Sequence, residues 1–193
     1  LPIFERISKE KEAPLYQTKG SIIQQPALPS YLLHNWKTAL EASSILYKSL
    51  PVSIEDNPKK YLTIRGRWQV VQNKPKIVLD VGHNEQGVHA IVNQLDYESY
   101  DHLHIMLGFS AEKETERILA LFPKDATFYI TKSTNERSAD PKIIATHIRG
   151  EKINCFLDFK EAFHTINKAV KKDDFVLICG SVFLVGDILQ EFF

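Results

Sequence analysis

The sequence carries no excess of either charge, and it has one methionine and two cysteines among its 193 residues. The 24 lysines and arginines balance 24 aspartates and glutamates, so the chain lacks the basic surplus that general nucleic-acid binding needs. No apolar run approaches the roughly 18–20 residues that span a bilayer, and no signal-peptide pattern is present. We therefore expect no nucleic-acid partner and no membrane segment.

Both cysteines, Cys155 and Cys179, lie in short apolar runs that are typical of strands. Two small buried thiols of this kind indicate a reducing, cytoplasmic setting. His102 and His104 are two residues apart, but no further ligand with metal-binding spacing lies nearby in the sequence. We predict neither a disulfide nor a metal site.

Three catalytic motifs are also missing from the sequence. No G-x-G-x-x-G follows a predicted strand, which disfavours a nicotinamide-dependent dehydrogenase. No G-x-x-x-x-G-K-[ST] loop is available to hold ATP phosphates, and no G-x-S-x-G elbow supports a hydrolase triad. A complete active site is therefore not visible in these residues.

After Gly66, short β-branched strands alternate with helices of about ten residues. This alternation predicts a doubly wound α/β domain over residues 67–193, with a mostly parallel sheet and helices on both faces. The expected strands are Trp68–Val71, Lys76–Asp80, His102–Gly108, Ala126–Thr131, Ile153–Leu157 and Asp174–Cys179. The expected helices are Glu85–Leu95, Thr115–Phe122, Pro141–Arg149, Lys160–Val170 and Phe183–Phe192.

Residues 1–66 have a different pattern. We expect strands around Leu1–Phe4, Leu15–Thr18 and Ser21–Gln24, and a helix over His34–Lys48. Two or three strands and one helix cannot bury a hydrophobic core of their own. We therefore expect this region to be the tail of another domain followed by a hinge. Because the single methionine is Met106 and the chain opens directly on an apolar segment, we expect a piece of a longer protein.

Polar residues follow the strand that ends at Asp80. In a doubly wound sheet, ligands bind beyond the carboxyl ends of the strands, where Asp80 and His83 are placed. Asp80 can accept hydrogen bonds from a ligand such as a ribose, and His83 would begin a helix whose free amides favour anions. Alternatively, Asn84 is only an N-cap and Asp80 only completes the turn.

Three other positions follow strands or join the two regions. Ser181, after Gly180, either binds a ligand or caps the last helix. Lys113 lies among glutamates, which is typical of a solvated face, and Arg137 is as well explained by fixing its loop. Arg67, at the junction of the two regions, can bind a phosphate with two parallel hydrogen bonds or pair with a surface carboxylate.

Taken in order, these segments resemble the C-terminal part of folylpolyglutamate synthases, in the Mur ligase superfamily. The segments that carry the resemblance are Tyr31 to Asn35, Gly66-Arg67-Trp68-Gln69, Ile77 to Asn84, Gly108 to Glu114 and Cys179 to Asp187. They are similar to the family's Y-Q-x-x-N, G-R-[FW]-Q, L-D-G-A-H-N, G-x(3)-D-K-D and G-S-x-[FY]-x-[VT]-[GA]-[ED]. The chain departs from these patterns at Pro29, at Leu32, at Glu112 and Glu114, and in Asp80-Val81-Gly82.

The resemblance implies a Rossmann-like glutamate-ligase C-terminal domain at 67–193, preceded by the tail of the ATPase domain at 1–66. It implies an ATP-dependent, Mg²⁺-dependent ligase that adds glutamate to folate through an acyl phosphate, with dihydropteroate as a further acceptor. By the same resemblance, Arg67 binds ATP phosphates, Asp80 lies at the ribose, and Asn35 lies near the adenine. His83 and Ser181 would lie near the phosphates and the glutamate, with Lys113 also on the glutamate side.

We accordingly expect a cytoplasmic monomer whose ligands are small molecules. The chain by itself is expected to be inactive, because the phosphate loop and most Mg²⁺ ligands of the family lie in its other domains. Two alternatives stay open: a Mur-type ligase that adds an amino acid to a cell-wall nucleotide, and a non-catalytic ligand-binding α/β module in which Asp80, His83 and Ser181 are structural.

Overall fold

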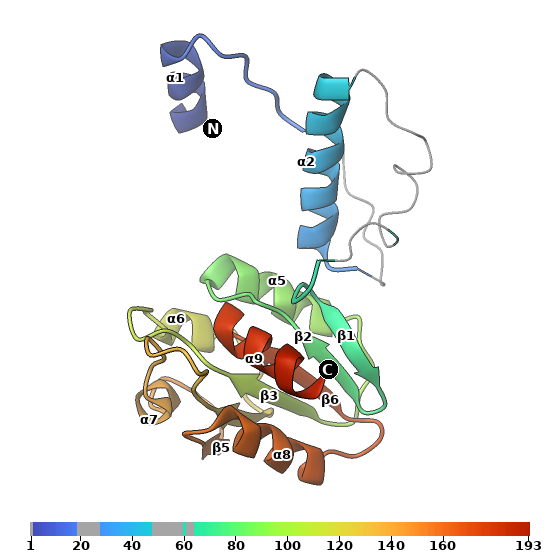
Figure 1. Cartoon of the computed structure of the whole chain (residues 1–193), viewed down its shortest axis with the longest axis vertical. Helices are drawn as coiled ribbons and strands as arrows, with labels where there is room; N and C mark the ends of the chain where they lie inside the picture. Colours follow the sequence, from blue (N-terminus) through green and yellow to red (C-terminus); the bar gives the residue numbers. More distant parts are fainter. Residues whose placement is uncertain (1, 19–27, 48–59, 61–63) are drawn as a thin grey trace.

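The computed structural model describes residues 2–18, 28–47, 60 and 64–193, and a six-stranded sheet lies at its centre (Figure 1). The strand order is β1-β2-β6-β3-β4-β5. Every neighbouring pair is parallel except β1 and β2, which form an antiparallel hairpin. The strands are β1 Gln69–Asn73, β2 Lys76–Leu79, β3 Leu103–Leu107, β4 Thr127–Ile130, β5 Lys152–Cys155 and β6 Phe175–Cys179. The prediction of a mostly parallel sheet is confirmed.

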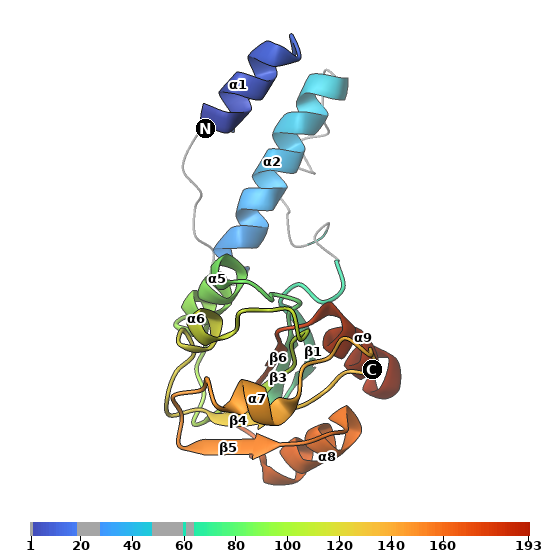
Figure 2. The ribbon, with the colours of Figure 1, turned by 90° about the vertical axis from the view of Figure 1, so that its left-hand side faces the viewer.

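Helices cover both faces of this sheet, as predicted (Figure 2). One face packs against α5 (Glu85–Leu95), α6 (Glu116–Leu119) and α7 (Pro141–Ala145). The other face packs against α8 (Phe159–Ala169) and α9 (Val182–Phe192). The domain is therefore doubly wound.

Each central strand supplies both layers of the core, because successive side chains of a strand point to opposite faces. In β6, Leu177 lies in the layer under α5 while Val176 and Ile178 lie in the layer under α8 and α9. Such strands must be apolar throughout, and all five residues of β3 and of β6 are buried.

Two helices are shorter than predicted. We expected Thr115–Phe122 and Pro141–Arg149, but α6 ends at Leu119 and α7 at Ala145. In both cases the chain continues in tighter turns whose amides bond three residues back, as in Phe122 N to Leu119 O and Ile148 N to Ala145 O. The apolar spacing thus continues although the helix has ended.

Cys155 is exposed, which corrects the prediction of two buried thiols. It lies in β5, the strand at the open edge of the sheet, where three of the four residues are exposed. Cys179, in the fully buried β6, is inaccessible as predicted, and burial raises the pKa of its thiol.

The prediction of a strand at Leu1–Phe4 is wrong over its described residues, because Pro2–Glu10 form helix α1. Ile3, Phe4 and Ile7 recur at helical spacing, and Arg6 pairs with Glu10 one turn later at 2.7 Å. No strand forms over residues 15–18 either, while Ser21–Gln24 lie outside the described residues. Short apolar runs do not distinguish a strand from a helix.

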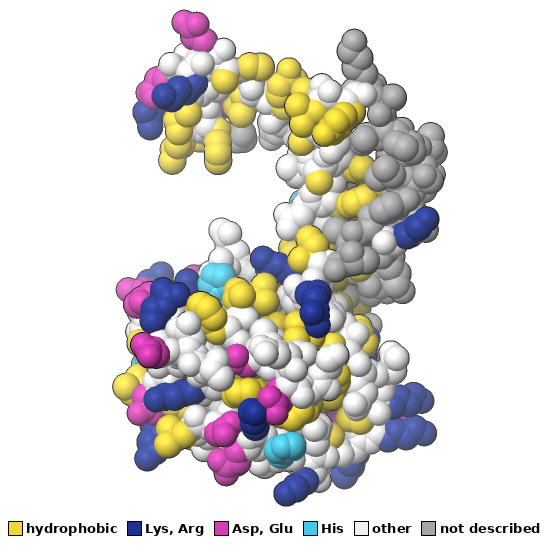
Figure 3. All heavy atoms as spheres, in the orientation of Figure 1, with side chains coloured by type: hydrophobic (Ala, Val, Ile, Leu, Met, Phe, Trp, Pro, Cys, Tyr) yellow, Lys and Arg dark blue, Asp and Glu magenta, His cyan; other side chains and the backbone are white. Residues whose placement is uncertain are grey.

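The second helix, α2, spans Ser30–Tyr47 and contacts α5 of the sheet domain near its first turn (Figures 1 and 2). Only Leu32 and Leu33 of this helix are buried. Figure 3 shows hydrophobic side chains at the surface of α1 and α2. The exposed large hydrophobic residues of α2 are Ile45, Leu46 and Tyr47. No helix in the described parts of the chain combines the length and apolarity needed to cross a membrane.

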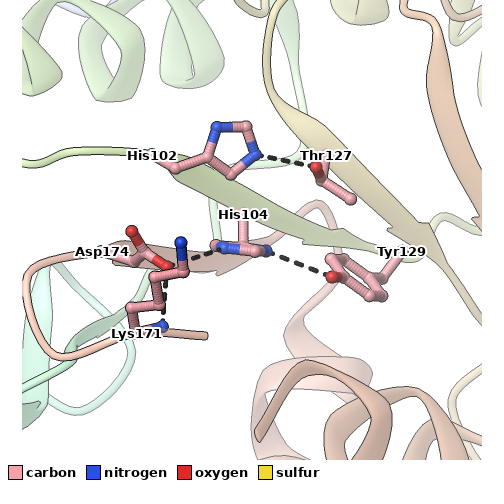
Figure 4. Close-up of polar contacts among 6 residues, drawn as sticks. All are labelled: His102, His104, Thr127, Tyr129, Lys171 and Asp174. Carbon is pink, nitrogen blue, oxygen red and sulfur yellow. Dashed lines mark hydrogen bonds and ion pairs between the residues drawn. The ribbon is translucent and has the colours of Figure 1, made fainter. Parts of the chain in front are cut away.

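A buried polar network joins the amino-terminal ends of β6, β3 and β4 (Figure 4). The imidazole of His104 lies 3.3 Å from an Asp174 carboxylate oxygen through Nε2 and 3.1 Å from the Tyr129 hydroxyl through Nδ1. Burial lowers the pKa of His104 below its ordinary value. Burial opposes ionisation of Asp174 as well, but hydrogen bonds from Lys171 N and His104 outweigh it and hold the pKa of Asp174 below its ordinary value. The pair therefore favours a neutral imidazole beside a carboxylate.

We predict that the free energy of unfolding falls as the pH drops below about 6.5, the ordinary pKa of histidine. Below that pH, His104 is protonated in the unfolded chain but stays largely neutral in the folded chain, because its pKa is lower there. The stabilisation is complete above that pH and is lost as the pH falls toward the lowered folded-state pKa. In urea titrations, His104→Asn should flatten this dependence between about pH 7.5 and about pH 5.5. His164→Asn, which removes an exposed imidazole, is the control. Equal slopes for wild type and His104→Asn would contradict the assignment.

Candidate functional site

The strand order creates a crevice between the carboxyl ends of β2 and β6. These strands are parallel neighbours, yet β2 is followed by α5 on one face and β6 by α9 on the other. Because the two connections leave in opposite directions, the sheet edge opens between them, which is where ligands bind in doubly wound folds. The amide of Gly180 donates to the carbonyl of Gly82 at 3.0 Å and joins the two loops.

A pocket of about 230 Å³ lies at the β2 side of this crevice. It is formed by residues from four segments: the start of α2, the turn before β1, the loop after β2 and the first turns of α5. Its lining residues are Tyr31, Arg67, Asp80, Gly82, His83, Asn84, Gln86, Gly87 and Ala90. Three of the predicted site residues, Arg67, Asp80 and His83, therefore meet in one pocket.

Asp80 is 1% exposed, and its carboxylate accepts three hydrogen bonds from the protein. The Tyr31 hydroxyl and the Trp68 amide donate to Oδ2, and the Gly82 amide donates to Oδ1. Burial raises the pKa of Asp80, although these donors and the positive charge of Arg67 oppose the rise. The carboxylate is thus fully engaged by the protein, and its predicted contact with a ribose stays a prediction.

Arg67 and His83 flank the segments that Asp80 holds. Arg67 is exposed and makes no hydrogen bond or ion pair with any other described residue. His83 is half-buried, and its Nδ1 lies 3.0 Å from the Val81 carbonyl. That contact favours a proton on Nδ1, which leaves Nε2 as an acceptor in the neutral imidazole. The pocket accordingly offers one cation and one imidazole nitrogen to a ligand.

Helix α5 begins at this pocket. Asn84 is its N-cap, and the side-chain oxygen of Asn84 accepts from the Gly87 amide at 2.8 Å. The capping role that we considered for Asn84 is therefore present, while Asn84 also lines the pocket. The amides of a first helical turn favour anions, so this end of α5 adds to the attraction that Arg67 exerts on an anion.

Ser181 lies across the crevice, at the end of β6. It is the N-cap of α9, and its hydroxyl accepts from the Phe183 amide at 3.2 Å. The residue before it, Gly180, has a φ of +96°, and a Cβ there would lie 2.7 Å from the Gly108 carbonyl oxygen. The glycine lets three loops approach closely at the carboxyl edge of β2, β6 and β3.

Asn35 and Lys113 are not among the residues that line the described pocket. Asn35 is exposed on α2, one turn beyond Tyr31. Lys113 is exposed in the loop after β3, where its amide bonds to the Ser110 carbonyl at 3.1 Å. Their predicted roles near the adenine and the glutamate stay predictions.

The loop after β4 is fixed to α9 by two contacts. Thr134 donates through its amide and its hydroxyl to the Asp187 carboxylate at 2.7 and 2.8 Å, and the guanidinium carbon of Arg137 lies 5.6 Å from the centre of the Phe183 ring. The backbone amide of Arg137 also donates to the side-chain oxygen of Asn135. This agrees with the loop-fixing role that we considered for Arg137.

Tyr31 is the site residue whose role was not predicted. It lines the pocket and hydrogen-bonds Asp80 from 49 positions away in the sequence. Its place at the head of the Y-x-x-x-N segment was the available signal. Among the described residues, no group of three His, Cys, Asp or Glu side chains could hold a metal ion.

The fold and the crevice define a doubly wound α/β domain that suits an anionic ligand. The chain belongs to the Mur ligase family: the family model described as Mur ligase, glutamate ligase domain, matches residues 66–182. The predicted fold class and family are therefore confirmed.

Two kinds of curated relatives match the chain. A dihydrofolate synthase/folylpolyglutamate synthase of Buchnera aphidicola is 24% identical over 157 residues, which are 79% of this chain and 38% of the relative. A UDP-N-acetylmuramoyl-L-alanyl-D-glutamate–2,6-diaminopimelate ligase of Helicobacter hepaticus is 27% identical over 179 residues, or 86% of this chain and 37% of that enzyme. The chain thus spans less than two fifths of either relative's length.

Solved structures share the fold. Escherichia coli FolC in complex with ADP, without folate substrate, superposes with a TM-score of 0.79 and 19% identity, covering 96% of this chain and 49% of that one. The bifunctional folylpolyglutamate synthase/dihydrofolate synthase of Yersinia pestis with Mn, AMPPNP and L-glutamate bound gives a TM-score of 0.75 and 21% identity. It covers 96% of this chain and 50% of that one.

We predict that Gly180→Ala lowers the free energy of unfolding by about 2 kcal/mol or more, because the left-handed backbone and the close carbonyl both oppose a Cβ. Gly186→Ala is the matched control, since no atom lies within 4 Å of its Cβ position and alanine favours the interior of α9. Urea titrations should show opposite signs for the two variants. A Gly180→Ala variant as stable as wild type would contradict the prediction, because it would show that the backbone at position 180 can accommodate a Cβ.

Proposed function

We propose that this chain is the C-terminal part of an ATP-dependent ligase of the folylpolyglutamate synthase type. The complete enzyme adds glutamate to folate, and dihydrofolate synthesis is a second activity of the same site. The observation that carries the proposal is the pocket in which Arg67 and His83 meet at the first turn of α5. The family and the folate-dependent relatives support the same function.

In the proposed reaction, the γ-phosphoryl group of ATP passes to the acceptor carboxylate, which gives an acyl phosphate and releases ADP. The amine of glutamate then attacks the acyl carbon, and inorganic phosphate and a proton leave as the amide bond forms. The residues of the pocket fit a polyphosphate. Arg67 is exposed and unpaired among the described residues, so its guanidinium can bind phosphate oxygens without breaking an existing ion pair. The first-turn amides of α5 add donors of the same polarity.

The remaining assignments combine the resemblance to the family with the positions of the residues in the fold. His83 and Ser181 lie on the two loops that the Gly180–Gly82 hydrogen bond joins, so they flank the crevice in which the glutamate amine would approach the phosphate. Lys113 binds the glutamate from the β3 loop. Asn35 lies near the adenine, and Asp80 lies close to the ribose while it holds the pocket's backbone.

Mg²⁺ does not fit the pocket formed by this chain. The Asp80 carboxylate is the buried acidic group there, and its oxygens already accept from Tyr31, Trp68 and Gly82. Replacing these donors by a cation would break the contacts that shape the pocket. The proposed enzyme therefore binds its metal through other parts of the ligase. Its monomeric state and cytoplasmic location are further parts of the proposal, independent of the metal.

A Mur-type ligase that adds an amino acid to a cell-wall nucleotide is the second candidate. The Helicobacter hepaticus ligase favours it, because its identity of 27% extends over 86% of the chain. Both candidates use the same ATP chemistry on this domain, and they differ in the acceptor. Replacing folate with a muramoyl-peptide nucleotide in one assay distinguishes them.

We predict that Arg67→Ala and His83→Ala each lower kcat/KM by about 100-fold or more in the longer ligase, because each removes a group that meets charge developing in the transition state. The assay follows ADP released in the presence of folate and glutamate. Arg65→Ala is the matched control, since Arg65 is exposed two residues away and does not line the pocket. The melting temperature should change little in all three. Normal turnover by Arg67→Ala and His83→Ala would refute the site.

A second prediction concerns the 193-residue chain alone. It should release no ADP from ATP in the presence of folate and glutamate, because the described pocket supplies one side of a nucleotide site and the sequence has no phosphate loop. Folate- and glutamate-dependent turnover by the purified chain would show that these residues carry a complete active site.

A further inference from the structure

Helix α2 is attached to the sheet domain through its first turn. Leu32 and Leu33 are buried there, and Leu32 belongs to the core layer that α5 covers. At the far end of the helix, Ile45, Leu46 and Tyr47 are exposed. Apolar burial alone is non-directional, so it holds the first turn in place without fixing the angle of the helix.

A directional contact between this turn and the sheet domain is the hydrogen bond from the Tyr31 hydroxyl to Asp80. The oxygen of Asp80 that accepts it also accepts the Trp68 amide, and the other oxygen accepts the Gly82 amide. One buried carboxylate therefore connects α2, the turn that leads into β1 and the loop after β2.

The two backbone amides lie next to the site residues. Trp68 directly follows Arg67, and Gly82 directly precedes His83. Since the peptide unit is planar and stiff, a shift of either amide moves the neighbouring residue with it. Trp68 has a φ of +44°, which is uncommon for a residue with a side chain, so its backbone depends on neighbouring contacts to hold it there. Asp80 thereby holds the backbone segments that carry the Arg67 and His83 side chains.

We propose that Tyr31 is a positioning residue that couples the orientation of α2 to the placement of Arg67 and His83. Its hydroxyl acts through Asp80 and touches neither of them. This inference rests on the proposed function only where it treats Arg67 and His83 as site residues. The coupling itself is a property of the fold.

The burial of the Asp80 carboxylate explains why losing the Tyr31 hydroxyl would disturb the site. Asp80 is 1% exposed, so water does not readily replace a missing donor. Removing the hydroxyl leaves an acceptor under-satisfied beside Trp68 and Gly82, while the apolar packing of the first turn, which includes Leu32, stays in place. We expect the first turn of α2 to separate from Asp80 more often and to admit water to both amides.

The test compares Tyr31→Phe with Tyr47→Phe. Both variants remove one hydroxyl from α2 and keep the ring, but Tyr47 is 70% exposed and its hydroxyl has no hydrogen-bond partner within the described residues. Nitroxide labels on Ala42→Cys, which is exposed on α2, and on the exposed native Cys155 report the angle of the helix. Cys179 is fully buried and stays unlabelled.

Two readouts follow from these variants. The label-to-label distance distribution should broaden in Tyr31→Phe and stay as in wild type in Tyr47→Phe. Amide hydrogen exchange at Trp68 and Gly82 should become at least about tenfold faster in Tyr31→Phe, the smallest loss expected for one hydrogen bond to a charged group. The amides of Ile105 and Leu177, in the central strands, should exchange as before.

The outcomes separate the coupling from a general effect on stability. Broadened distances with local exchange at Trp68 and Gly82 support the proposal. Unchanged distances, or exchange that rises equally in the central strands, overturn it. Neither readout needs a substrate, so the coupling can hold or fail independently of ligase activity.

Discussion

Two parallel neighbours in the sheet, β2 and β6, send their following helices to opposite faces, and the site depends on this constraint. A sheet whose connections all left in one direction would bring the loops after these strands together and close the edge. Here α5 and α9 leave in opposite directions, so the backbone separates beside Gly82 and Gly180 and is bridged by one hydrogen bond. Arg67 and His83 acquire a shared pocket because the edge is open at that point.

Much of the fold was predictable because local and long-range signals agree. Helix α5 was predicted at its observed bounds, since the apolar stripe of Val88, Ile91 and Leu95 starts directly after a residue that can cap it. The strand expected at Leu1–Phe4 was wrong, because four apolar residues fit either period and the helix is decided only by residues further on. The exposure of Cys155 follows from the place of β5 in the strand order, which no local pattern contains.

The candidate site was predictable where it follows strand ends. His83 and Ser181 lie at the expected edge because the carboxyl ends of parallel strands share one side of a sheet. Arg67 reaches the same edge because it precedes β1, which runs antiparallel to β2. The contact between Tyr31 and Asp80 was not predictable, since it exists only once α2 has packed on α5. Sequence spacing also could not show that three donors of the protein itself would hydrogen-bond to the Asp80 carboxylate.

If Tyr31 couples α2 to the pocket as proposed, a rotation of α2 about its first turn is amplified at the far end of the helix. From Tyr31 to Tyr47 the helix rises about 24 Å, at about 1.5 Å per residue. A rotation of roughly ten degrees about the first turn would displace the far end by about 4 Å, while the pocket itself would shift by a small fraction of that. Because the far end moves much more than the pocket, the position of the exposed end of α2 would be a sensitive measure of the geometry around Arg67 and His83. A partner that bound this end could in turn change that geometry.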